Sequence, residues 1–300
     1  MLLPKLFRMI WTGYLLGKLP ARQILKQVQD DEVGNTRVTV ILDLFEGSIP
    51  KFYIRNKMKN WTHNNFTIHQ FSELESTNSN AFEAALLRKI SHGEIILADS
   101  QNSGRGRQSR SWSSPSGNLY FSLVLQPKVP AEKIAQISFV GITSLRLAIS
   151  KIVKNSTSAK WPNDLLIDEK KVAGLLLESK ISGNDAEFAI LGIGLNINSN
   201  PDNTIFPAAN LKDFGVEITP ELALKNFLDE FEILYQNWLD FGFKGVRKLW
   251  LQNAYRLGEQ ISVRLDDKVI AGIFEDLDEE GNLVLNRSGE ILKVGAADIF

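Results

Sequence analysis

Three apolar runs joined by short turns constrain the fold of this chain more than any other feature. The runs lie at 165–167, 171–178 and 187–198, and polar turns at 168–170 and 182–185 separate them. Strand-like runs with connections this short pair with their neighbours in antiparallel order. They are apolar along nearly their whole length, so both faces of the sheet must be covered. The sequence therefore predicts a covered antiparallel meander.

Helix-like and strand-like patterns flank this meander. Upstream, a strand at 67–71 precedes N-cap candidates at 76–78 and a helix through 81–90. Further expected elements are a buried strand at 119–125 and amphipathic helices at 131–154, 221–238 and 243–253. From residue 258 the sequence pattern changes, and it predicts short alternating strands at 261–265, 269–274, 283–285 and 291–294. This spacing predicts a small C-terminal barrel.

The first 57 residues differ in character from the rest of the chain. They carry excess positive charge and show no pair of amphipathic helices joined as in a helix-turn-helix motif. Basic residues interrupt the apolar stretch at 1–20, which therefore fits neither a signal peptide nor a membrane span. We expect an extension at 1–57, a main domain at 58–255 and the barrel at 256–300, with the functional protein beginning near Met58.

Composition narrows the class of function. A formal net charge of -1 argues against a protein that coats nucleic acid. The chain has no cysteine, which excludes disulfides, thiolate nucleophiles and cysteine-bound metals and fits a reducing compartment such as the cytoplasm. His63, His69 and His92 lack metal-ligand spacing, so we expect no metal-binding residues.

The polar segment 98–112 lies between two strand-like runs. It carries Arg105, Arg107 and Arg110 together with Gly104 and Gly106. Glycine lets the backbone approach a ligand closely, and arginine donates to phosphate or carboxylate. By itself the segment also fits a solvated basic loop.

Other polar motifs have plain structural readings when each is taken alone. The segment 76–78 suits a helix cap, 160–164 suits a turn with a packed tryptophan, and Lys171 suits a strand start. Gly192 and Gly194 suit a strand on which another backbone packs closely. Lys171 lies across a short hairpin from Asp164, so we expect the two on one sheet face. Together the motifs predict a site for a small polar molecule and a nucleoside triphosphate.

In this order the motifs resemble those of biotin–protein ligases. The matching segments are Ser76-Thr77-Asn78, Gln101 with Gly104-Arg105-Gly106-Arg107, Lys160-Trp161-Pro162-Asn163-Asp164, 171–178 and 192–196. The resemblance covers about residues 65–300 and implies an α+β fold related to class II aminoacyl-tRNA synthetases. Such a fold has a mixed, largely antiparallel sheet with helices mainly on one face, and a small SH3-like C-terminal barrel follows it.

The resemblance also implies a two-step reaction. Biotin and ATP, with Mg²⁺, give biotinyl-5′-adenylate, which then acylates one lysine of a biotin carboxyl carrier domain such as that of acetyl-CoA carboxylase. The family's bifunctional members carry a winged helix that residues 1–57 do not resemble, so a ligase without DNA binding is expected. We further expect no membrane association, a cytoplasmic location, and a monomer or weak homodimer.

Roles for individual residues follow from the same resemblance. The biotin-binding residues would be Ser76, Thr77, Asn78, Gln101, Arg105, Gly106, Arg107 and Lys171. The nucleotide-binding residues would be Arg107, Trp112, Lys160, Asn163 and Asn196. The catalytic residues would be Lys171, Arg107 and Lys160. The resemblance does not identify a general base, and Asp164 is our own candidate for this catalytic role.

One departure and two alternatives remain. Many members continue the arginine motif with Arg-Gly-Arg, where this chain has Gln108-Ser109-Arg110, so the far end of the loop is expected to order differently. A lipoate or octanoyl ligase would share the fold and adenylate chemistry, but it would not require the urea-directed residues at 76–78 and 101. A nucleic-acid module using the arginine segment is the other alternative, against which the net charge argues.

Overall fold

The computed structural model describes residues 57–300 except 203, 205, 266, 267, 296, 297 and 300. The chain divides into two units, 1–56 and 57–300, and the described residues belong to the second. The predicted N-terminal extension lies outside the described residues, apart from Lys57. Within the described part of the chain, no helix is both long and apolar enough to cross a membrane.

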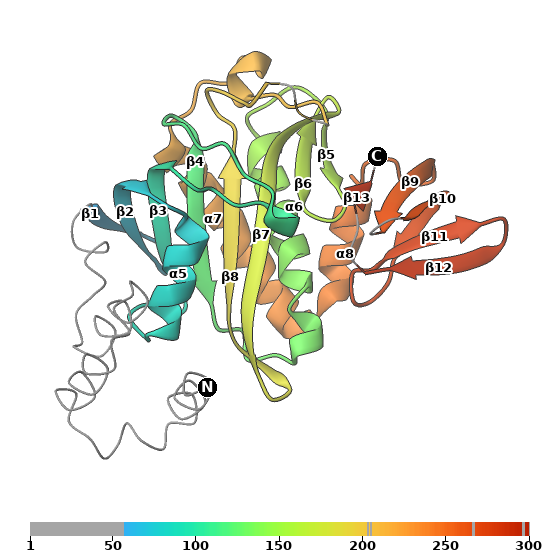
Figure 1. Cartoon of the computed structure of the whole chain (residues 1–300), viewed down its shortest axis with the longest axis horizontal. Coiled ribbons are helices and arrows are strands. Elements are labelled where there is room, and N and C mark those ends of the chain that lie inside the picture. Colours follow the sequence, from blue (N-terminus) through green and yellow to red (C-terminus); the bar gives the residue numbers. More distant parts are fainter. Residues whose placement is uncertain (1–56, 203, 205, 266–267, 296–297, 300) are drawn as a thin grey trace, which may run out of the picture. The chain divides into compact units, whose positions relative to one another are not determined.

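An eight-stranded sheet forms the centre of the described unit (Figure 1). Its strand order is β1-β2-β3-β4-β8-β7-β6-β5, and only β2 and β3 pair in parallel among these described strands. The strands are β1 (Lys57–His63), β2 (Phe66–Leu74), β3 (Glu94–Gln101), β4 (Leu119–Leu125), β5 (Thr157–Lys160), β6 (Asp164–Ile167), β7 (Lys170–Ser182) and β8 (Asp185–Leu195). The predicted meander is β6-β7-β8, and the mixed, largely antiparallel sheet is confirmed.

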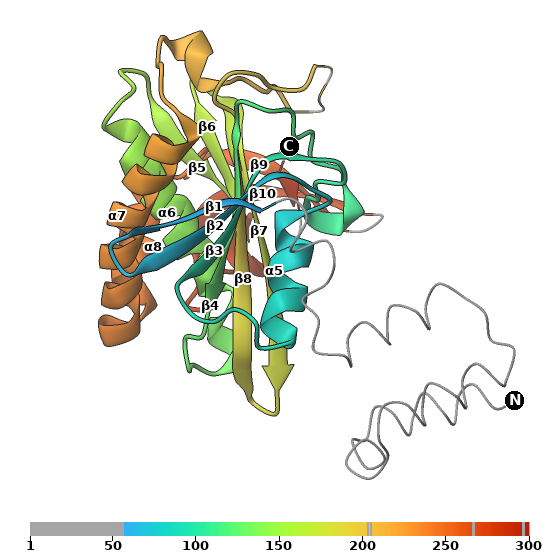
Figure 2. The ribbon, with the colours of Figure 1, turned by 90° about the vertical axis from the view of Figure 1, so that its left-hand side faces the viewer.

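The helices lie mainly on one face of this sheet, as Figure 2 shows. On that face lie α6 (Gln136–Ser150), α7 (Pro220–Phe241) and α8 (Phe243–Leu251), and α5 (Thr77–Leu86) lies on the other. Most positions of α6 are buried, because the sheet covers one side of this helix and α7 and α8 pack against it. Short 3₁₀ turns occur at Arg107–Ser109, Ala131–Lys133 and Leu211–Phe214.

A five-stranded antiparallel sheet follows α8, where the small barrel was predicted. Its strands are β9 (Gln260–Leu265), β10 (Lys268–Leu277), β11 (Leu283–Arg287), β12 (Glu290–Val294) and β13 (Asp298–Ile299). The turn between β10 and β11 packs on the larger sheet's helices and on Trp161. Trp161 Nε1 donates to Gly281 O at 3.1 Å, and Gln136 Nε2 donates to Glu279 O at 2.7 Å. These bonds join the two sheets within one unit, and the predicted boundary at 255/256 falls between α8 and β9.

Some element boundaries differ from the predicted ones for local reasons. Strand β1 was not expected, and it pairs with β2 through a two-residue turn at Asn64 and Asn65. Helix α5 begins at Thr77 and ends at Leu86, because Arg88 takes a left-handed conformation with φ 54°. The predicted helix at 131–154 is a 3₁₀ turn followed by α6, which ends at Ser150.

Candidate active site

A cavity of about 900 Å³ lies beside the N-terminus of α5. Residues of β6, β7 and β8, the first turn of α5, the segment 104–112 and the segment 201–208 line it. We call residues 104–112 the arginine loop. The structure brings every predicted site residue to this one cavity, although they are spread over more than a hundred positions of the chain. The residues are Ser76, Thr77, Asn78, Gln101, Arg105, Gly106, Arg107, Trp112, Lys160, Asn163, Asp164, Lys171 and Asn196.

Glycines on β7 and β8 form the floor of the cavity. A Cβ at Gly192 would overlap the side-chain amide of Asn78. A Cβ at Gly194 would lie 2.5 Å from Trp112 Nε1, and one at Gly174 would lie 3.1 Å from the same indole. The glycines are therefore needed because the side chains of Asn78 and Trp112 pack directly against these strands, and not because another backbone approaches, as the sequence suggested for 192 and 194.

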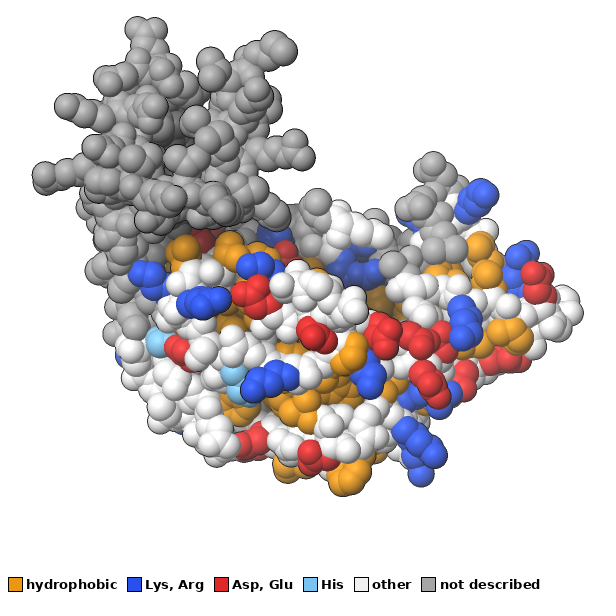
Figure 3. Space-filling view, turned by 90° about the horizontal axis from the view of Figure 1, so that it is seen from below, with side chains coloured by type: hydrophobic (Ala, Val, Ile, Leu, Met, Phe, Trp, Pro, Cys, Tyr) orange, Lys and Arg blue, Asp and Glu red, His pale blue; other side chains and the backbone are white. Residues whose placement is uncertain are grey.

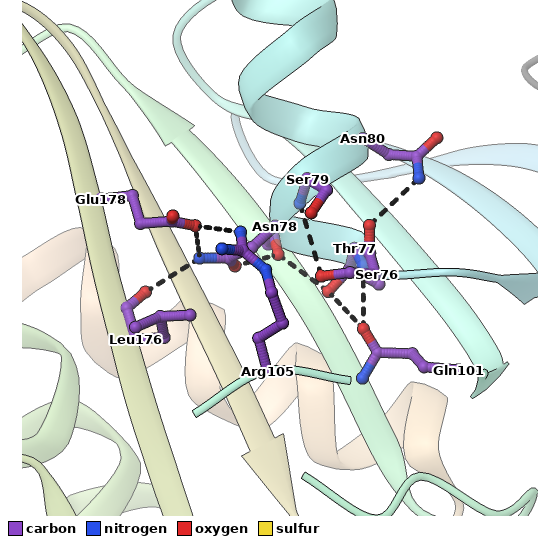
Figure 4. Close-up of polar contacts among 10 residues, drawn as sticks. Ser76, Thr77, Asn78, Ser79, Asn80, Gln101, Arg105, Leu176 and Glu178 are labelled. Atoms are coloured by element: carbon purple, nitrogen blue, oxygen red, sulfur yellow. Dashed lines mark hydrogen bonds and ion pairs between the residues drawn. The ribbon is translucent and has the colours of Figure 1, made fainter. Parts of the chain in front are cut away.

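A network of neutral polar groups occupies one end of the cavity (Figure 4). Ser76 caps α5 by accepting from Ser79 N at 3.4 Å. Gln101 Oε1 accepts from Thr77 N at 2.8 Å and from Thr77 Oγ1 at 3.2 Å. Ser122 Oγ lies 2.8 Å from Thr77 Oγ1 and 2.5 Å from Asn78 Oδ1. These amide and hydroxyl groups offer both donors and acceptors without charge, as a urea-like ligand requires.

The amide of Asn78 is held from two sides. Its Nδ2 donates to Leu176 O at 3.2 Å and to Glu178 Oε2 at 3.0 Å, and its Oδ1 faces Ser122. Glu178 also forms an ion pair with Arg105 of the arginine loop, at 2.7 Å (Figure 4). Arg105 therefore lines the cavity while its guanidinium binds a protein carboxylate.

Two lysines and one carboxylate form the charged part of the cavity. Lys171 Nζ lies 2.6 Å from Asp164 Oδ1, and Lys160 Nζ lies 3.9 Å from Asp164 Oδ2. In the strand register Lys171 stands opposite Leu166, and Asp164 stands opposite Gly174, so the long lysine side chain spans the offset. One negative and two positive charges leave this part of the cavity with an excess of positive charge, which favours an anionic ligand.

Aromatic rings cover both lysines. Lys171 Nζ lies 5.3 Å from the centre of the Trp112 ring, and Lys160 Nζ lies 4.6 Å from that of Phe206. The side chain of Lys160 is only 7% exposed, whereas that of Lys171 is 25% exposed. Lys171 is thus the more accessible of the two cations.

The remaining predicted residues take different positions at the cavity wall. Arg107 Nη1 lies 3.5 Å from Asn163 Oδ1, and Asn163 donates in turn to Leu175 O. Asn196 is buried and donates to Ala209 O at 3.1 Å, so its amide holds the segment beside Lys171 in place. In the distal part of the arginine loop, Gln108 has φ 52° and accepts from Arg110 Nη2 at 2.7 Å.

Sequence reasoning missed several residues at this site. Ser122 is a small polar residue among the aliphatic and aromatic residues of β4, and that exception was a usable signal. Glu178 ends the 171–178 motif but was assigned no role. Ser122 and Glu178 act through lining residues, whereas Phe206 and Arg264 line the cavity themselves. Phe206 and Arg264 come from a loop and from the small C-terminal sheet, where no local pattern marks them.

No group of three or more His, Asp or Glu residues suited to hold a metal occurs among the described residues. Asp164 is the acidic residue in the cavity lining. Charged side chains elsewhere are of both signs, and Figure 3 shows them interspersed over the described part of one face.

Comparison with known proteins agrees with this geometry. The biotin/lipoate A/B protein ligase family model matches residues 71–196, and the biotin protein ligase C terminal domain model matches 257–300. The biotin--[acetyl-CoA-carboxylase] ligase of Paracoccus denitrificans is 36% identical over 238 residues, which is 75% of this chain and 97% of that protein. The bifunctional ligase/repressor BirA of Bacillus subtilis is 33% identical over 235 residues, 75% of this chain and 71% of that protein.

A solved structure gives the same result. The biotin protein ligase from Aquifex aeolicus in complex with biotin and ATP superposes with a TM-score of 0.67 at 28% identity, covering 78% of this chain and 97% of that chain. Sequence likeness along nearly the whole Paracoccus protein, the shared fold and the converging site residues lead to one assignment. The chain belongs to the biotin protein ligase family.

Proposed function

We propose that this chain activates biotin with ATP to biotinyl-5′-adenylate and diphosphate, and then transfers the biotinyl group to one lysine of a carrier domain of acetyl-CoA carboxylase. The observation that carries the proposal is the single cavity in which a neutral urea-type network adjoins Lys171, Asp164 and Lys160. Biotin has the same two ends, a ureido ring and a carboxylate.

The first step brings two anions together. A biotin carboxylate oxygen attacks the α-phosphorus of ATP, an O–P bond forms, and diphosphate leaves. Two unit charges 4 Å apart interact by about 4 kcal/mol at an effective dielectric constant near 20, so fixed cations must offset this repulsion. Lys171 is the accessible cation and would lie between carboxylate and α-phosphate. Lys160 and Arg107 would neutralise the phosphate side.

The neutral end would bind the ureido ring. Both amide hydrogens of Asn78 are engaged with Leu176 and Glu178, so its Oδ1 is the atom that can accept from a ring N–H. Thr77 and Gln101 form a linked pair beside it. A hydrogen-bonding site of this kind discriminates strongly against ligands that lack the matching groups, because its buried polar atoms would be left unpaired.

The second step needs no enzyme nucleophile. The carrier's lysine amine attacks the acyl carbon of the adenylate, an amide bond forms, the bond to the phosphate oxygen breaks, and AMP leaves. The amine loses one proton in this step. Asp164 is the carboxylate within the cavity and would accept that proton, which is the role proposed for it.

Mg²⁺ would enter with the triphosphate. One or two protein carboxylates together with substrate phosphates commonly suffice for this ion, and the cavity offers Asp164. The bound ion would neutralise phosphate charge during the first step. The enzyme's own residues would hold biotin, orient its carboxylate and exclude water from the adenylate.

Several finer points belong to the same proposal. The cytoplasm is the compartment in which a cysteine-free enzyme of this class would meet its carrier. A lipoate or octanoyl ligase is the alternative, and the neutral network of Thr77, Asn78 and Gln101 supports biotin over these longer apolar acids.

Labelling of a carrier domain tests the proposal. The full chain is mixed with Mg²⁺-ATP, a carrier domain and labelled biotin, with labelled lipoate in a parallel reaction. We expect ATP-dependent biotin transfer to one carrier lysine. Lys171→Ala should lower biotin-dependent ATP–diphosphate exchange by at least a hundredfold, since a fixed charge at a reacting centre contributes about 3 kcal/mol or more. Lys170→Ala removes an exposed lysine one position earlier and serves as the control.

Transfer of lipoate in preference to biotin would contradict the substrate assignment. Normal exchange in Lys171→Ala would remove this lysine from the first step.

A further inference from the structure

Glu178 joins two parts of the cavity wall that are far apart in the chain. The residue lies on β7, and the reaction proposed above assigns it no role. Its Oε2 accepts from Asn78 Nδ2 at 3.0 Å and from Arg105 Nη2 at 2.7 Å (Figure 4). Asn78 belongs to the first turn of α5, and Arg105 belongs to the arginine loop. One carboxylate oxygen therefore links the ureido side of the cavity to the loop that borders it.

The arginine loop depends on side chains for its attachment. At its base, Trp112 N donates to Gly104 O at 2.8 Å, and Ser103 N just before it donates to Glu75 O at 2.9 Å. Beyond the base, the described backbone bonds of 105–111 stay within the loop, such as Gly106 N to Arg110 O at 2.7 Å. The Arg105–Glu178 ion pair is a short, charge-assisted contact from this segment to the sheet.

This ion pair is partly exposed to water, so we expect it to form and break readily. The side chains of Arg105 and Glu178 are 41% and 28% exposed. Ion pairs with this much access to water change an equilibrium by about 1.5- to 5-fold. Such a contact favours the closed loop without preventing it from opening for substrate entry and carrier access.

The same carboxylate also fixes the orientation of Asn78. With one amide hydrogen on Glu178 and the other on Leu176 O, the oxygen Oδ1 is turned toward Ser122 and the cavity. A flipped amide would place its NH₂ against the hydroxyl network and its oxygen against Glu178, where two acceptors would face each other. The ureido pocket keeps its acceptor because Glu178 and Leu176 O both accept from the other end of the Asn78 amide.

We propose that Glu178 is a positioning residue, which holds the arginine loop through Arg105 and sets the direction of the Asn78 amide. One carboxylate then contributes both to closure of the loop and to the shape of the ureido pocket. This inference rests on the function proposed above, and it adds a residue that contacts neither the reacting carboxylate nor the phosphates.

Loop opening is measured first, without ligand, on the full chain. Trypsin cuts after Arg107 and Arg110, and fragments beginning at Gln108 and Ser111 are quantified by mass. When opening is fast, the cleavage rate follows the open population. Glu178→Gln keeps the size of the side chain and removes its charge, so cleavage should rise about 1.5- to 5-fold.

A double-mutant cycle tests whether Arg105 and Glu178 hold the loop as an interacting pair. Arg105→Gln should accelerate cleavage at the same two sites, and the double variant Arg105→Gln/Glu178→Gln should be no faster than the faster single variant. Glu83→Gln is the matched control, because Glu83 lines the same small hollow as Arg105 and Glu178 and is exposed. Additive effects, or cleavage of Glu178→Gln at the wild-type rate, would overturn the attachment role.

Ligand measurements test the second half of the proposal. Glu178→Gln should bind biotin more weakly, seen as a raised KM in ATP–diphosphate exchange with kcat changed less. It should also release more adenylate, seen as biotin on a bystander protein. If the wild type is active and Glu178→Gln leaves both the KM for biotin and the release of adenylate unchanged, the positioning role is contradicted. An inactive wild type would instead contradict the proposed function, while the cleavage result would stand by itself.

Discussion

At the scale of single residues, the cavity depends on missing side chains as much as on those present. Gly192 and Gly194 lie on the central strand β8, where a β-branched residue would ordinarily be favoured. Asn78 and Trp112 occupy the space that side chains at these glycines would fill. Side chains that arrive from α5 and from the arginine loop therefore pack directly on the glycine floor of the site.

Substituting Gly192 tests this dependence. In Gly192→Ala the new methyl group would displace the Asn78 amide, which would lose one or more hydrogen bonds to Leu176, Glu178 or Ser122. Losing one such bond corresponds to about 1–1.5 kcal/mol, or about tenfold weaker biotin binding. Titration calorimetry with biotin measures the change. Gly245→Ala, at an open position on α8, should bind biotin with wild-type affinity. Wild-type affinity in Gly192→Ala as well would contradict the need for glycine in the cavity floor.

The polar motifs could be recognised from the sequence because each residue stands beside others of its motif. Ser76 to Asn78 and Lys160 to Asp164 are examples, and these residues line the cavity except for the buried Trp161 and the half-buried Pro162. Phe206 and Arg264 could not be recognised in this way. Their place at the site depends on how a loop and a second sheet pack, and local spacing carries no information about that packing.

At the scale of elements, the arginine loop resembles a short hairpin closed over the cavity edge. Arg105 is bridged to Ser111 across the loop, and the 3₁₀ turn Arg107–Ser109 forms its end. Arg107 reaches Asn163 on the opposite wall at 3.5 Å. The loop thus reaches the residue next to Asp164, in the charged part of the cavity.

Arg107→Gly tests the loop as a barrier around the adenylate. The substitution removes a cation beside the proposed phosphate site and adds backbone freedom. We expect adenylate to escape, so that lysines of unrelated proteins acquire biotin at least tenfold more than with wild type. A loop barrier of about 1.4 kcal/mol would account for that factor. Mass spectrometry of a carrier mixed with a bystander protein measures it, and carrier-only labelling by the variant would contradict the barrier.

Some element boundaries could not be predicted from the local sequence alone. The pattern of apolar runs located the meander because its strands are largely apolar and its turns are short, although β6 has only four residues. Strand β1 was missed because its residues alternate poorly, and pairing with β2 supplies its order. Residues 131–133 continue the helical pattern of α6, but they form a separate 3₁₀ turn whose backbone pairs with Asn184 at the end of the β7–β8 hairpin.

At the scale of the whole described unit, the turn between β10 and β11 holds the C-terminal sheet against the larger one. Gly281 in this turn has φ 88° and packs against Phe139, where a Cβ would overlap the ring. Gly281 O accepts from Trp161, whose neighbours in the chain include Lys160 and Asn163 of the cavity wall. The turn therefore helps to hold the C-terminal sheet against the larger sheet. It thereby keeps Arg264, which lies on the C-terminal sheet, at the cavity that this residue lines.

Asp278 orders that turn and gives it a dependence on pH. Its Oδ1 accepts from Asn282 N at 2.8 Å and from Glu280 N at 3.1 Å, and Lys293 Nζ lies 3.2 Å from its Oδ2. Burial acts to raise the pKa of Asp278, but the hydrogen bonds from Asn282 and the Lys293 ion pair outweigh it, so the pKa lies below its ordinary value of 3.8. The folded state thus favours the charged form, and its contribution to stability is complete above pH 3.8 and is lost as the pH falls through the lower folded pKa.

Asp278→Asn removes this contribution at every pH. At pH 7 we expect the variant to be less stable by about 1–2 kcal/mol, because hydrogen bonds to a charged acceptor are replaced by weaker ones. As the pH falls below 3.8, Asp278 of the wild type loses its charge and its contribution to stability disappears. The variant lacks this contribution at every pH, so the two curves of Tm against pH should converge. Calorimetry between neutral and strongly acidic pH measures both. Glu280→Gln, an exposed change in the same turn, should stay close to wild type throughout, and parallel curves for Asp278→Asn and wild type would show that the turn does not owe its order to this carboxylate.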